Sequence, residues 1–270
     1  MSTPTGPDGL PFVKGHGTEN DFVLIPDRDD RITLTAELAA LLCERRTGPG
    51  GDGVIRVVGR AGGGFFMDYR NADGSLAEMC GNGARVFARF LVDSGWAGPG
   101  RIDFETRGGA RSAELGAGGD VSIGMGPVSI GMSSSATVAG VEIVGTAVDV
   151  GNPHLVCWVE DPALLDLSVQ PDFNRQAFPE GVNIEFIARV GPDAVSMRVY
   201  ERGSGETRSC GTGTVAAAAV ALAADGRSAG AVEVTVPGGR VVVEIADGAA
   251  VLTGPAVLSY SGTINPAILS

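Results

Sequence analysis

The chain has 270 residues, of which 44% are hydrophobic and 19% charged, the composition of a globular protein large enough to bury one or two cores. Its net charge of −12 excludes a general affinity for nucleic acid or anionic membranes, because both bind basic surfaces. Lys14 is the only lysine, and its place near the N-terminus argues against the internal Schiff base that a pyridoxal phosphate enzyme needs.

The ends and the cysteines indicate a cytoplasmic protein. The first nine residues lack the basic and apolar regions of a signal peptide, and the longest strongly apolar run, 215–224, is too short to span a bilayer. No membrane partner is therefore expected. In the cytoplasm four cysteines do not indicate disulfides, and no Cys-x-x-Cys pair or His-rich cluster suggests a metal site.

The first part of the chain is expected to form short strands and two helices. Thr35 can cap a helix that continues to about Arg46. A second helix is expected over residues 84–94, with Gly95 as its stop. The expected strands follow Asn20 and cover residues 54–58 and 65–69.

The middle of the chain carries the expected domain boundary. From Arg101 to about Met125, alternating segments separated by glycine predict antiparallel strands. The Ser-Ser-Ser-Ala tract at 133–136 is expected to be a connector, and we place the boundary near 127–131. The expected halves are residues 1–128, to which the tail 256–270 returns, and residues 129–255.

The second half repeats the first at a nearly constant offset. Cys80-Gly-Asn-Gly and Cys210-Gly-Thr-Gly lie 130 positions apart, and each directly precedes an expected helix. Three further pairs of segments are related at offsets of 128 to 132, namely those at Asn20 and Asn152, at Gly53 and Gly181, and at Met67 and Met197. The order and constancy of these offsets indicate an internal duplication.

The helix after Cys210 suggests the architecture. Residues 214–224 are apolar on every side, so this helix is expected to be surrounded by protein. Because strands flank it, we expect an α+β fold of two pseudo-symmetric halves. Each half would be a curved, mostly antiparallel sheet around a central helix, with the active site in the cleft between the halves.

A cysteine before Gly-x-Gly at a helix start has a defined chemistry. The helix N-terminus offers unpaired N–H groups and a partial positive charge, the glycines let the backbone approach an anion, and the same field favours a thiolate. Two such elements can place a thiol on each side of a carboxylate-bearing carbon. One thiolate would remove the α-proton and the other thiol would return a proton from the opposite face. His154 and Glu201 lie in polar loops of the second half and could tune the thiols.

The motifs in full resemble the diaminopimelate epimerase family. The likeness is carried by His16-Gly-x-x-Asn-Asp-Phe, Asn71-Ala-Asp-Gly-Ser, Met79-Cys-Gly-Asn-Gly-Ala-Arg, Gly151-Asn-Pro-His, Gly181-Val-Asn and Glu201-Arg-Gly with Cys210-Gly-Thr-Gly. The resemblance implies a cofactor-independent isomerase that interconverts LL- and meso-2,6-diaminopimelate on the route to lysine and peptidoglycan. It also implies two αβ halves, a tail that returns to the first half, and a homodimer. No metal is implied.

The resemblance also assigns roles to individual residues. Cys80 and Cys210 would be the base and acid pair, and His154 and Glu201 would sit beside the reacting amino group and the thiols. The reacting carboxylate would be held by the backbone N–H groups of Gly81, Asn82, Gly211 and Thr212. The distal amino acid end would be held by Asn71, Asn183 and Arg202, with Arg202 on its carboxylate. Asn20 and Asn152 would complete the pocket. Gly53 stands where some relatives have a polar side chain, which leaves a contact there in doubt.

Some residues of these segments favour a structural interpretation over a functional one. Cys43 and Cys157 lie in apolar periodic segments and are expected to be buried core thiols. Arg85 and Arg89, one helical turn apart, are expected on a solvated face. Residues 211–216 also satisfy a dinucleotide-binding fingerprint, but a polar loop precedes them rather than a strand.

Relatives of the same fold leave two alternatives. Proline and hydroxyproline epimerases also use two cysteines, but they carry His where Asn82 stands and would give Asn71, Asn183 and Arg202 no purpose. A non-epimerising isomerase or binding protein of this fold would usually lack the cysteines, and both are present here.

Overall fold

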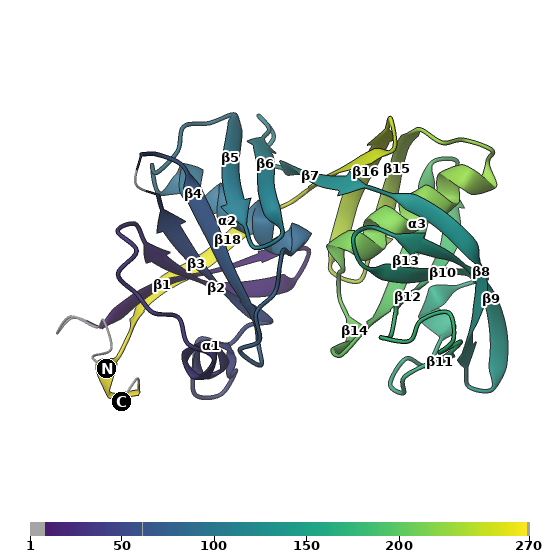
Figure 1. Cartoon of the computed structure of the whole chain (residues 1–270), viewed down its shortest axis with the longest axis horizontal. Coiled ribbons are helices and arrows are strands. Elements are labelled where there is room, and N and C mark those ends of the chain that lie inside the picture. The colour runs from purple at the N-terminus through teal and green to yellow at the C-terminus, as the bar shows by residue number, and fades with distance from the viewer. Residues whose placement is uncertain (1–8, 61, 269–270) are drawn as a thin grey trace. The chain divides into compact units, whose positions relative to one another are not determined.

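The computed structural model describes residues 9–60 and 62–268 and divides the chain into two compact units. The first unit comprises the chain up to Ile123 and the stretch from Pro255 onward, and the second comprises Gly124–Gly254. Each unit is a mixed sheet with one long helix against it (Figure 1). The lead before residue 9 lies outside the described residues.

The first unit contains eight strands and two α-helices among the described residues. Its elements are β1 (Leu10–Gly17), β2 (Asn20–Asp27), α1 (Ala36–Cys43), β3 (Gly53–Gly59), β4 (Phe65–Asn71), α2 (Gly81–Asp93), β5 (Arg101–Thr106), β6 (Gly109–Leu115), β7 (Val121–Pro127), which continues into the second unit, β18 (Val257–Ile264) and the 3-10 helix η2 (Pro266–Ile268). β1 pairs antiparallel with β2 and with β18, so the strand near the C-terminus completes the sheet of the N-terminal unit. Helix α2 packs against β1, β2 and β18.

The second unit repeats this plan around α3. Its elements are β8 (Ser129–Val138), β9 (Val141–Asp149), β10 (Pro153–Trp158), the 3-10 helix η1 (Pro162–Leu164), β11 (Asp172–Phe173), β12 (Asn183–Gly191), β13 (Ala194–Glu201), β14 (Gly205–Thr207), α3 (Gly211–Ala224), β15 (Gly230–Val236), β16 (Gly239–Ala246) and β17 (Ala249–Gly254). Helix α3 lies against β13, β15 and β16 (Figure 1). Its residues 215–222 are buried on every side, as the sequence predicted.

Strand register confirms the internal repeat. β2 pairs with β3 in parallel, with Phe22 opposite Gly53. β10 pairs with β12 in parallel, with His154 opposite Asn183. Phe22 is therefore equivalent to His154, and Gly53 is equivalent to Asn183 rather than to Gly181, the residue to which the sequence comparison related it.

The structure differs from the expectations for the tract 133–136 and for Arg85. The tract 133–136 is not a connector but part of β8, which pairs antiparallel with β9. Its serines alternate between the two faces of a strand, where small polar side chains are tolerated at a sheet surface. Arg85 is not on a solvated face: it is fully buried in α2, its Nε donates to the Pro255 carbonyl oxygen at 3.2 Å, and its Nη2 donates to Thr18 Oγ1 at 3.3 Å.

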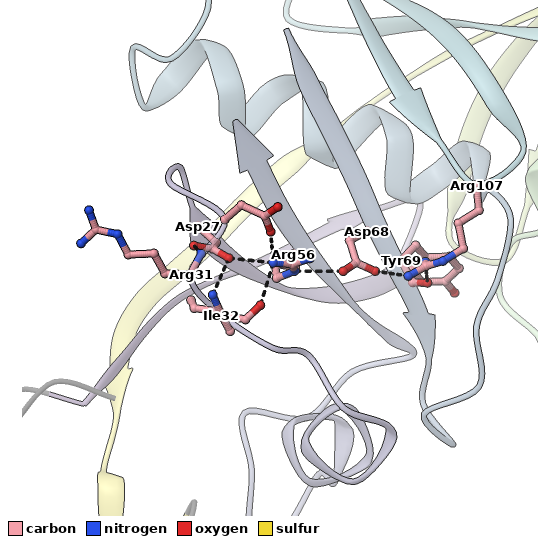
Figure 2. A network of polar contacts seen from close by, with 8 residues as sticks. Asp27, Arg31, Ile32, Arg56, Asp68, Tyr69 and Arg107 are labelled. Carbon is pink, nitrogen blue, oxygen red and sulfur yellow. Dashed lines mark hydrogen bonds and ion pairs between the residues drawn. The ribbon is translucent and has the colours of Figure 1, made fainter. Parts of the chain in front are cut away.

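A buried ionic network fixes β2, β3 and β4 relative to one another (Figure 2). Arg56 on β3 donates from Nη1 to Asp27 on β2 at 2.8 Å and from Nε to Asp68 on β4 at 2.9 Å. Arg107, in the turn after β5, pairs with the other oxygen of Asp68 and donates to the Tyr69 carbonyl at 2.8 Å. The same turn holds the segment before Cys80, because the backbone N–H of Gly108 donates to the carbonyl of Glu78 at 3.2 Å.

Within the described residues, none of the helices has the length and apolar character that crossing a membrane requires.

Candidate active site

Each of the two motif cysteines is the N-cap of its unit's long helix. Cys80 precedes α2 in an extended conformation, and its sulfur accepts from the backbone N–H of Gly83 at 3.5 Å. Cys210 precedes α3 in nearly the same conformation, and its sulfur accepts from Gly213 at 3.4 Å. The sulfur of each therefore lies among the unpaired N–H groups of a helix N-terminus, which favours an anion there.

In the first unit, an amide joins Cys80 to a charged loop. The thiol of Cys80 points to Oδ1 of Asn20 at 3.6 Å, and the same oxygen accepts from Nδ2 of Asn82 at 3.2 Å. Nδ2 of Asn20 donates to Asp52 at 2.8 Å. Asp52 is in turn paired with Arg45. The amide of Asn20 is thus held in one orientation, with its oxygen toward the thiol.

The amine of Lys14 is engaged by neighbouring groups in this unit and is therefore not free to form a Schiff base. It is buried, pairs with Asp21 at 2.6 Å and donates to the carbonyl of Gly50. Arg45 also binds Asp21 with two hydrogen bonds of 2.8 and 2.9 Å. Together these cations hold the pKa of Asp21 well below its usual range, against the burial that raises it.

Packing explains why Gly53 carries no side chain. A Cβ at this position would lie 2.5 Å from the ring of Tyr69 and 2.7 Å from the carbonyl oxygen of Arg70.

Asn71, at the end of β4, donates from Nδ2 to Ser75 Oγ at 3.0 Å within the turn that follows. The hydrogen bonds of its side chain therefore do not join Asn71 to Cys80.

In the second unit, polar contacts connect Cys210 to a buried ion pair. Thr212 Oγ1 lies 3.5 Å from the sulfur of Cys210 and accepts from Nδ2 of Asn152 at 3.4 Å. Oδ1 of Asn152 is 3.0 Å from Nε2 of His154, whose Nδ1 is 2.7 Å from the carboxylate of Glu185. Both members of the His154–Glu185 pair are fully buried.

Burial and carboxylates act together on Cys210. Burial raises the pKa of this thiol well above 9.0, and the negative charges of Glu201 and Glu185 raise it further. Hydrogen bonds from Thr212 and Gly213 act in the opposite direction. The pKa of Glu201 is itself raised by burial, although hydrogen bonds with Thr207 and Cys210 oppose that rise. The ionisation of the Cys210 thiol and that of the Glu201 carboxyl group therefore affect each other.

Asn183 and Arg202 form a second group in this unit. Oδ1 of Asn183 accepts from the backbone N–H of Arg202 at 3.0 Å, and its Nδ2 donates to the carbonyl of Pro153 at 3.2 Å. The guanidinium of Arg202 is exposed and donates to the carbonyl of Glu180 at 3.3 Å. A hollow of about 370 Å³ in the same unit has Asn152, Pro153 and Phe178 among its lining residues.

Two side chains near the thiols were not anticipated from the sequence. Asp52 orients Asn20, and Glu185 holds His154. The signal for Glu185 was present, because an acidic residue in the apolar strand Ile184-Glu-Phe-Ile is unusual. Asp52 gave no comparable signal, because an aspartate in a glycine-rich loop is ordinary.

The remaining cysteines are structural. Cys43 and Cys157 are buried as expected, and burial raises the pKa of each to about 12. In the described part of the chain no three His, Cys, Asp or Glu side chains are grouped as metal ligands.

Comparison with known proteins covers nearly the whole chain. The diaminopimelate epimerase from Rhodococcus jostii is 48% identical over 95% of this chain and 97% of its own length. The diaminopimelate epimerase from Corynebacterium glutamicum is 47% identical over 95% and 98%, and that from Thermobifida fusca is 48% identical over 94% and 97%.

Solved structures of lower identity share the fold. A phenazine biosynthesis protein of the PhzF family from Bacillus anthracis superposes with a TM-score of 0.70 at 15% identity, covering 94% of this chain and 98% of its own. A hydroxyproline epimerase from Agrobacterium vitis gives 0.66 at 14% identity, covering 95% and 92%. The sequence profile described as diaminopimelate epimerase matches residues 12–131 and 146–259, and the chain belongs to that family.

Proposed function

We propose that the chain interconverts LL- and meso-2,6-diaminopimelate, without a cofactor, by proton transfer between the substrate and two cysteines. The observation that carries the proposal is the equivalent placement of Cys80 and Cys210, each capping a helix whose third residue donates its N–H to the sulfur. Relatives 46 to 48% identical and named diaminopimelate epimerase support the substrate.

The reaction balances with two thiol groups alone. One cysteine, as thiolate, takes the proton from the α-carbon, and the electron pair of that C–H bond moves onto the neighbouring carboxylate as an enediolate. The other cysteine, as thiol, gives its proton to the opposite face of the same carbon and becomes the thiolate. The thiolate and thiol have then exchanged places, which is the state required for the reverse reaction.

The charges around Cys210 fit both of its states. As a thiol it can hydrogen-bond the carboxylate of Glu201. As a thiolate it accepts from Thr212 Oγ1 and from the backbone of Gly213. The raised pKa makes the thiolate of Cys210 a strong base, and the two donors stabilise it at the moment it forms.

The substrate-binding residues follow the family pattern. The backbone N–H groups of Gly81, Asn82, Gly211 and Thr212 would hold the reacting carboxylate, because they lie in the first turns of α2 and α3. Asn71, Asn183 and Arg202 would hold the distal amino acid end, with Asn20 and Asn152 beside the reacting centre. The exposed guanidinium of Arg202 suits a carboxylate. We also propose a cytoplasmic homodimer.

Solvent exchange tests the reaction directly. In deuterium oxide, with no added cofactor, deuterium should enter the α-carbon of LL-diaminopimelate as the meso isomer appears. Mass spectrometry and chiral chromatography follow both events. Equal turnover of proline or 4-hydroxyproline, or activity that disappears when metal or pyridoxal phosphate is removed, would overturn the proposal.

Removal of either thiol tests the two-base mechanism. Cys80→Ala and Cys210→Ala should each abolish epimerisation, with a drop of at least about 10³ in kcat, because each direction needs one base and one acid. Circular dichroism and thermal unfolding serve as controls for folding. If either variant retains a near-native rate, the mechanism is wrong.

A further inference from the structure

Five side chains of the second unit form one continuous series of polar contacts from a buried carboxylate to a thiol. Glu185 Oε1 lies 2.7 Å from His154 Nδ1, and His154 Nε2 lies 3.0 Å from Asn152 Oδ1. Asn152 Nδ2 donates to Thr212 Oγ1 at 3.4 Å, and Thr212 Oγ1 lies 3.5 Å from Cys210 Sγ. We call this series the Glu185 chain.

The groups in the Glu185 chain fix the direction of its hydrogen bonds. An ionised carboxylate and an amide oxygen can only accept, so His154 between them donates from both ring nitrogens. The oxygen of Asn152 is then engaged with the ring, and its amino group turns to Thr212. The oxygen of Thr212 accepts that bond, which leaves its hydrogen to point at the sulfur of Cys210.

We propose that Glu185 is a positioning residue for Cys210. By keeping both nitrogens of the His154 ring protonated, Glu185 sets the direction of the chain so that the hydroxyl of Thr212 donates to the Cys210 thiolate. The role rests on the proposed function, in which Cys210 is a thiolate for part of each turnover. Without the charge of Glu185 the ring of His154 holds a single proton. When that proton is on Nδ1, Nε2 accepts, the amide of Asn152 turns over, and Thr212 donates to Asn152 instead.

The side chain of Glu185 lies beneath the N-terminal turn of α3. The side chain is fully buried against the first turn of α3, since a Cβ at Gly213 would lie 2.6 Å from its Oε1. A helix N-terminus stabilises negative charge at this place. Its second oxygen, Oε2, has no hydrogen-bond partner among the described residues, so the contact with His154 is the one that compensates the charge.

The first unit shows that the fold does not need this ion pair. Its residues equivalent to His154 and Glu185 are Phe22 and Ile55, both fully buried, in strands of the same register. There a Cβ at Gly83 would meet the Cδ1 of Ile55 at 3.1 Å. An apolar pair therefore fills the same position beneath α2, and apolar replacement of buried ion pairs is often neutral or stabilising. The ionic pair beneath α3 serves Cys210 rather than folding.

Other ionisable groups border the chain without interrupting it. Glu201 on β13 acts electrostatically on Cys210, and both Glu185 and His154 act on Glu201. Cys157 on β10 has its pKa raised to about 12, chiefly by burial and secondly by Glu185. Glu201 also hydrogen-bonds the thiol of Cys210, but neither Glu201 nor Cys157 contacts the members of the chain between Glu185 and Thr212 by a hydrogen bond.

The alkylation rate of Cys210 distinguishes an effect of the Glu185 chain from an effect of the negative charge of Glu185 alone. Iodoacetamide reacts with the thiolate, so its rate at a fixed pH reports the thiolate fraction. The negative charge of Glu185 raises the pKa of Cys210, so loss of that charge alone would speed alkylation. Loss of the Thr212 hydrogen bond should instead slow it. We expect Glu185→Gln to slow alkylation of Cys210 by about tenfold, the effect of about one pKa unit.

Matched variants locate the effect in the chain. Thr212→Val should slow alkylation of Cys210 to a similar extent, Thr212→Ser should restore the native rate, and Glu185→Gln combined with Thr212→Val should add nothing further. Glu233→Gln removes an exposed carboxylate of the same unit and should leave the rate unchanged. Peptide-resolved mass spectrometry reads Cys80 in the same sample as the internal reference.

The double variant His154→Phe/Glu185→Ile copies the pair of the first unit. It should remain folded by circular dichroism and thermal unfolding, because Phe22 and Ile55 show that the position accepts an apolar pair. Its Cys210 should also be alkylated about tenfold more slowly, because the amide of Asn152 is no longer oriented. A native rate in this folded variant would overturn the role of Glu185, even if Glu185→Gln failed to fold.

Nitrogen NMR reads the ring directly. The chain has two histidines, so ¹⁵N-histidine labelling with His16→Gln leaves only the ring of His154. Both ring nitrogens should be protonated at pH 7 in the native chain, and one should lose its proton in Glu185→Gln. These measurements contain no substrate. A native chain that exchanges no diaminopimelate proton would overturn the proposed function alone, and unchanged ring signals and alkylation in an active protein would overturn the Glu185 chain alone.

Discussion

Glu201 is the carboxylate whose ionisation should make stability depend on pH. Burial raises its pKa above the ordinary 4.5 of a glutamate, so the folded state binds this proton more tightly than the unfolded chain. The resulting stabilisation is complete below the ordinary carboxyl pKa and is lost as pH rises through the raised value. We therefore expect Glu201→Gln, which does not ionise, to gain stability relative to the native chain as pH rises from about 4 to 7.

Urea unfolding at several pH values measures that difference. Glu206→Gln, a carboxylate on the neighbouring strand β14 that is paired with Arg198, is a suitable control. A stability difference between Glu201→Gln and the native chain that stays constant with pH would contradict the prediction.

The roles of some single residues could be predicted from the sequence, and those of others could not. The cysteine caps were predictable, because a thiol before Gly-x-Gly and an apolar run is a local pattern. The burial of Arg85 was not, because its acceptor, the Pro255 carbonyl, lies in the segment that leads into β18, 170 residues further along the chain. The partnership of His154 with Glu185 depends on the parallel register of β10 and β12, which local pattern does not determine.

The first turns of the two long helices should respond differently to the same substitution. In α3, a Cβ at Gly213 would lie 2.6 Å from Oε1 of Glu185, which the bond to His154 holds in place. In α2, a Cβ at Gly83 would meet the ends of Ile55 and Met67, both at 3.1 Å, which can shift, and would be in ordinary contact with the ring of Phe22 at 3.4 Å. Gly213→Ala should therefore cost about 2 kcal/mol of unfolding free energy, and Gly83→Ala should cost less.

Thermal and urea unfolding of both variants measure the difference. The substitutions are matched in chemistry and in helix position, so helix propensity cancels between them. Equal costs for Gly213→Ala and Gly83→Ala would show that Glu185 is free to move away from the helix.

The strands of the first unit depend on the network of Figure 2. The Arg56 and Asp68 side chains are only 14% and 7% exposed, so removal of one partner leaves a poorly solvated charge. Asp68→Ala should cost about 3 kcal/mol, because Arg56 and Arg107 both lose a carboxylate. Asp103→Ala breaks an ion pair whose members are 69% and 70% exposed and should cost far less than Asp68→Ala.

Chemical denaturation of the two variants tests this contrast. If Asp68→Ala proves no more costly than Asp103→Ala, the network does not stabilise the unit.

At the level of elements, one segment rich in glycine and one rich in serine have more regular structure than the sequence predicted. Helix α2 begins at Gly81 rather than at 84, because the sulfur of Cys80 accepts the Gly83 N–H and extends a helix through residues of poor propensity. Residues 133–136 have the composition of a linker, yet pairing with β9 makes them a strand. Both errors have one cause: a contact outside the segment decided its conformation.

The duplication could be recognised from the sequence because equivalent residues have the same structural role in both halves. Cys80 and Cys210 cap helices, and Gly83 and Gly213 donate to them. What differs between the copies lies beneath the helices, where Phe22 and Ile55 in one unit correspond to His154 and Glu185 in the other. A repeat found by likeness cannot reveal the positions at which its copies diverge, and those positions distinguish the surroundings of the two thiols.

The first unit takes its last strand from the end of the chain, and this dependence can be tested by truncation. A chain that ends at Gly254 lacks β18, the antiparallel partner of β1, and lacks the carbonyl of Pro255 that accepts from buried Arg85. A buried guanidinium that has lost one of its acceptors and a strand with an open edge are both destabilising. Amide hydrogen exchange should therefore become fast in β1 and α2 while α3 and β12 stay protected, because the strands that pack on α3 all lie between residues 124 and 254. Native-like protection of β1 and α2 in the truncated chain would show that the first unit folds without its returning strand. Uniform loss of protection would show that the second unit does not fold independently of the first.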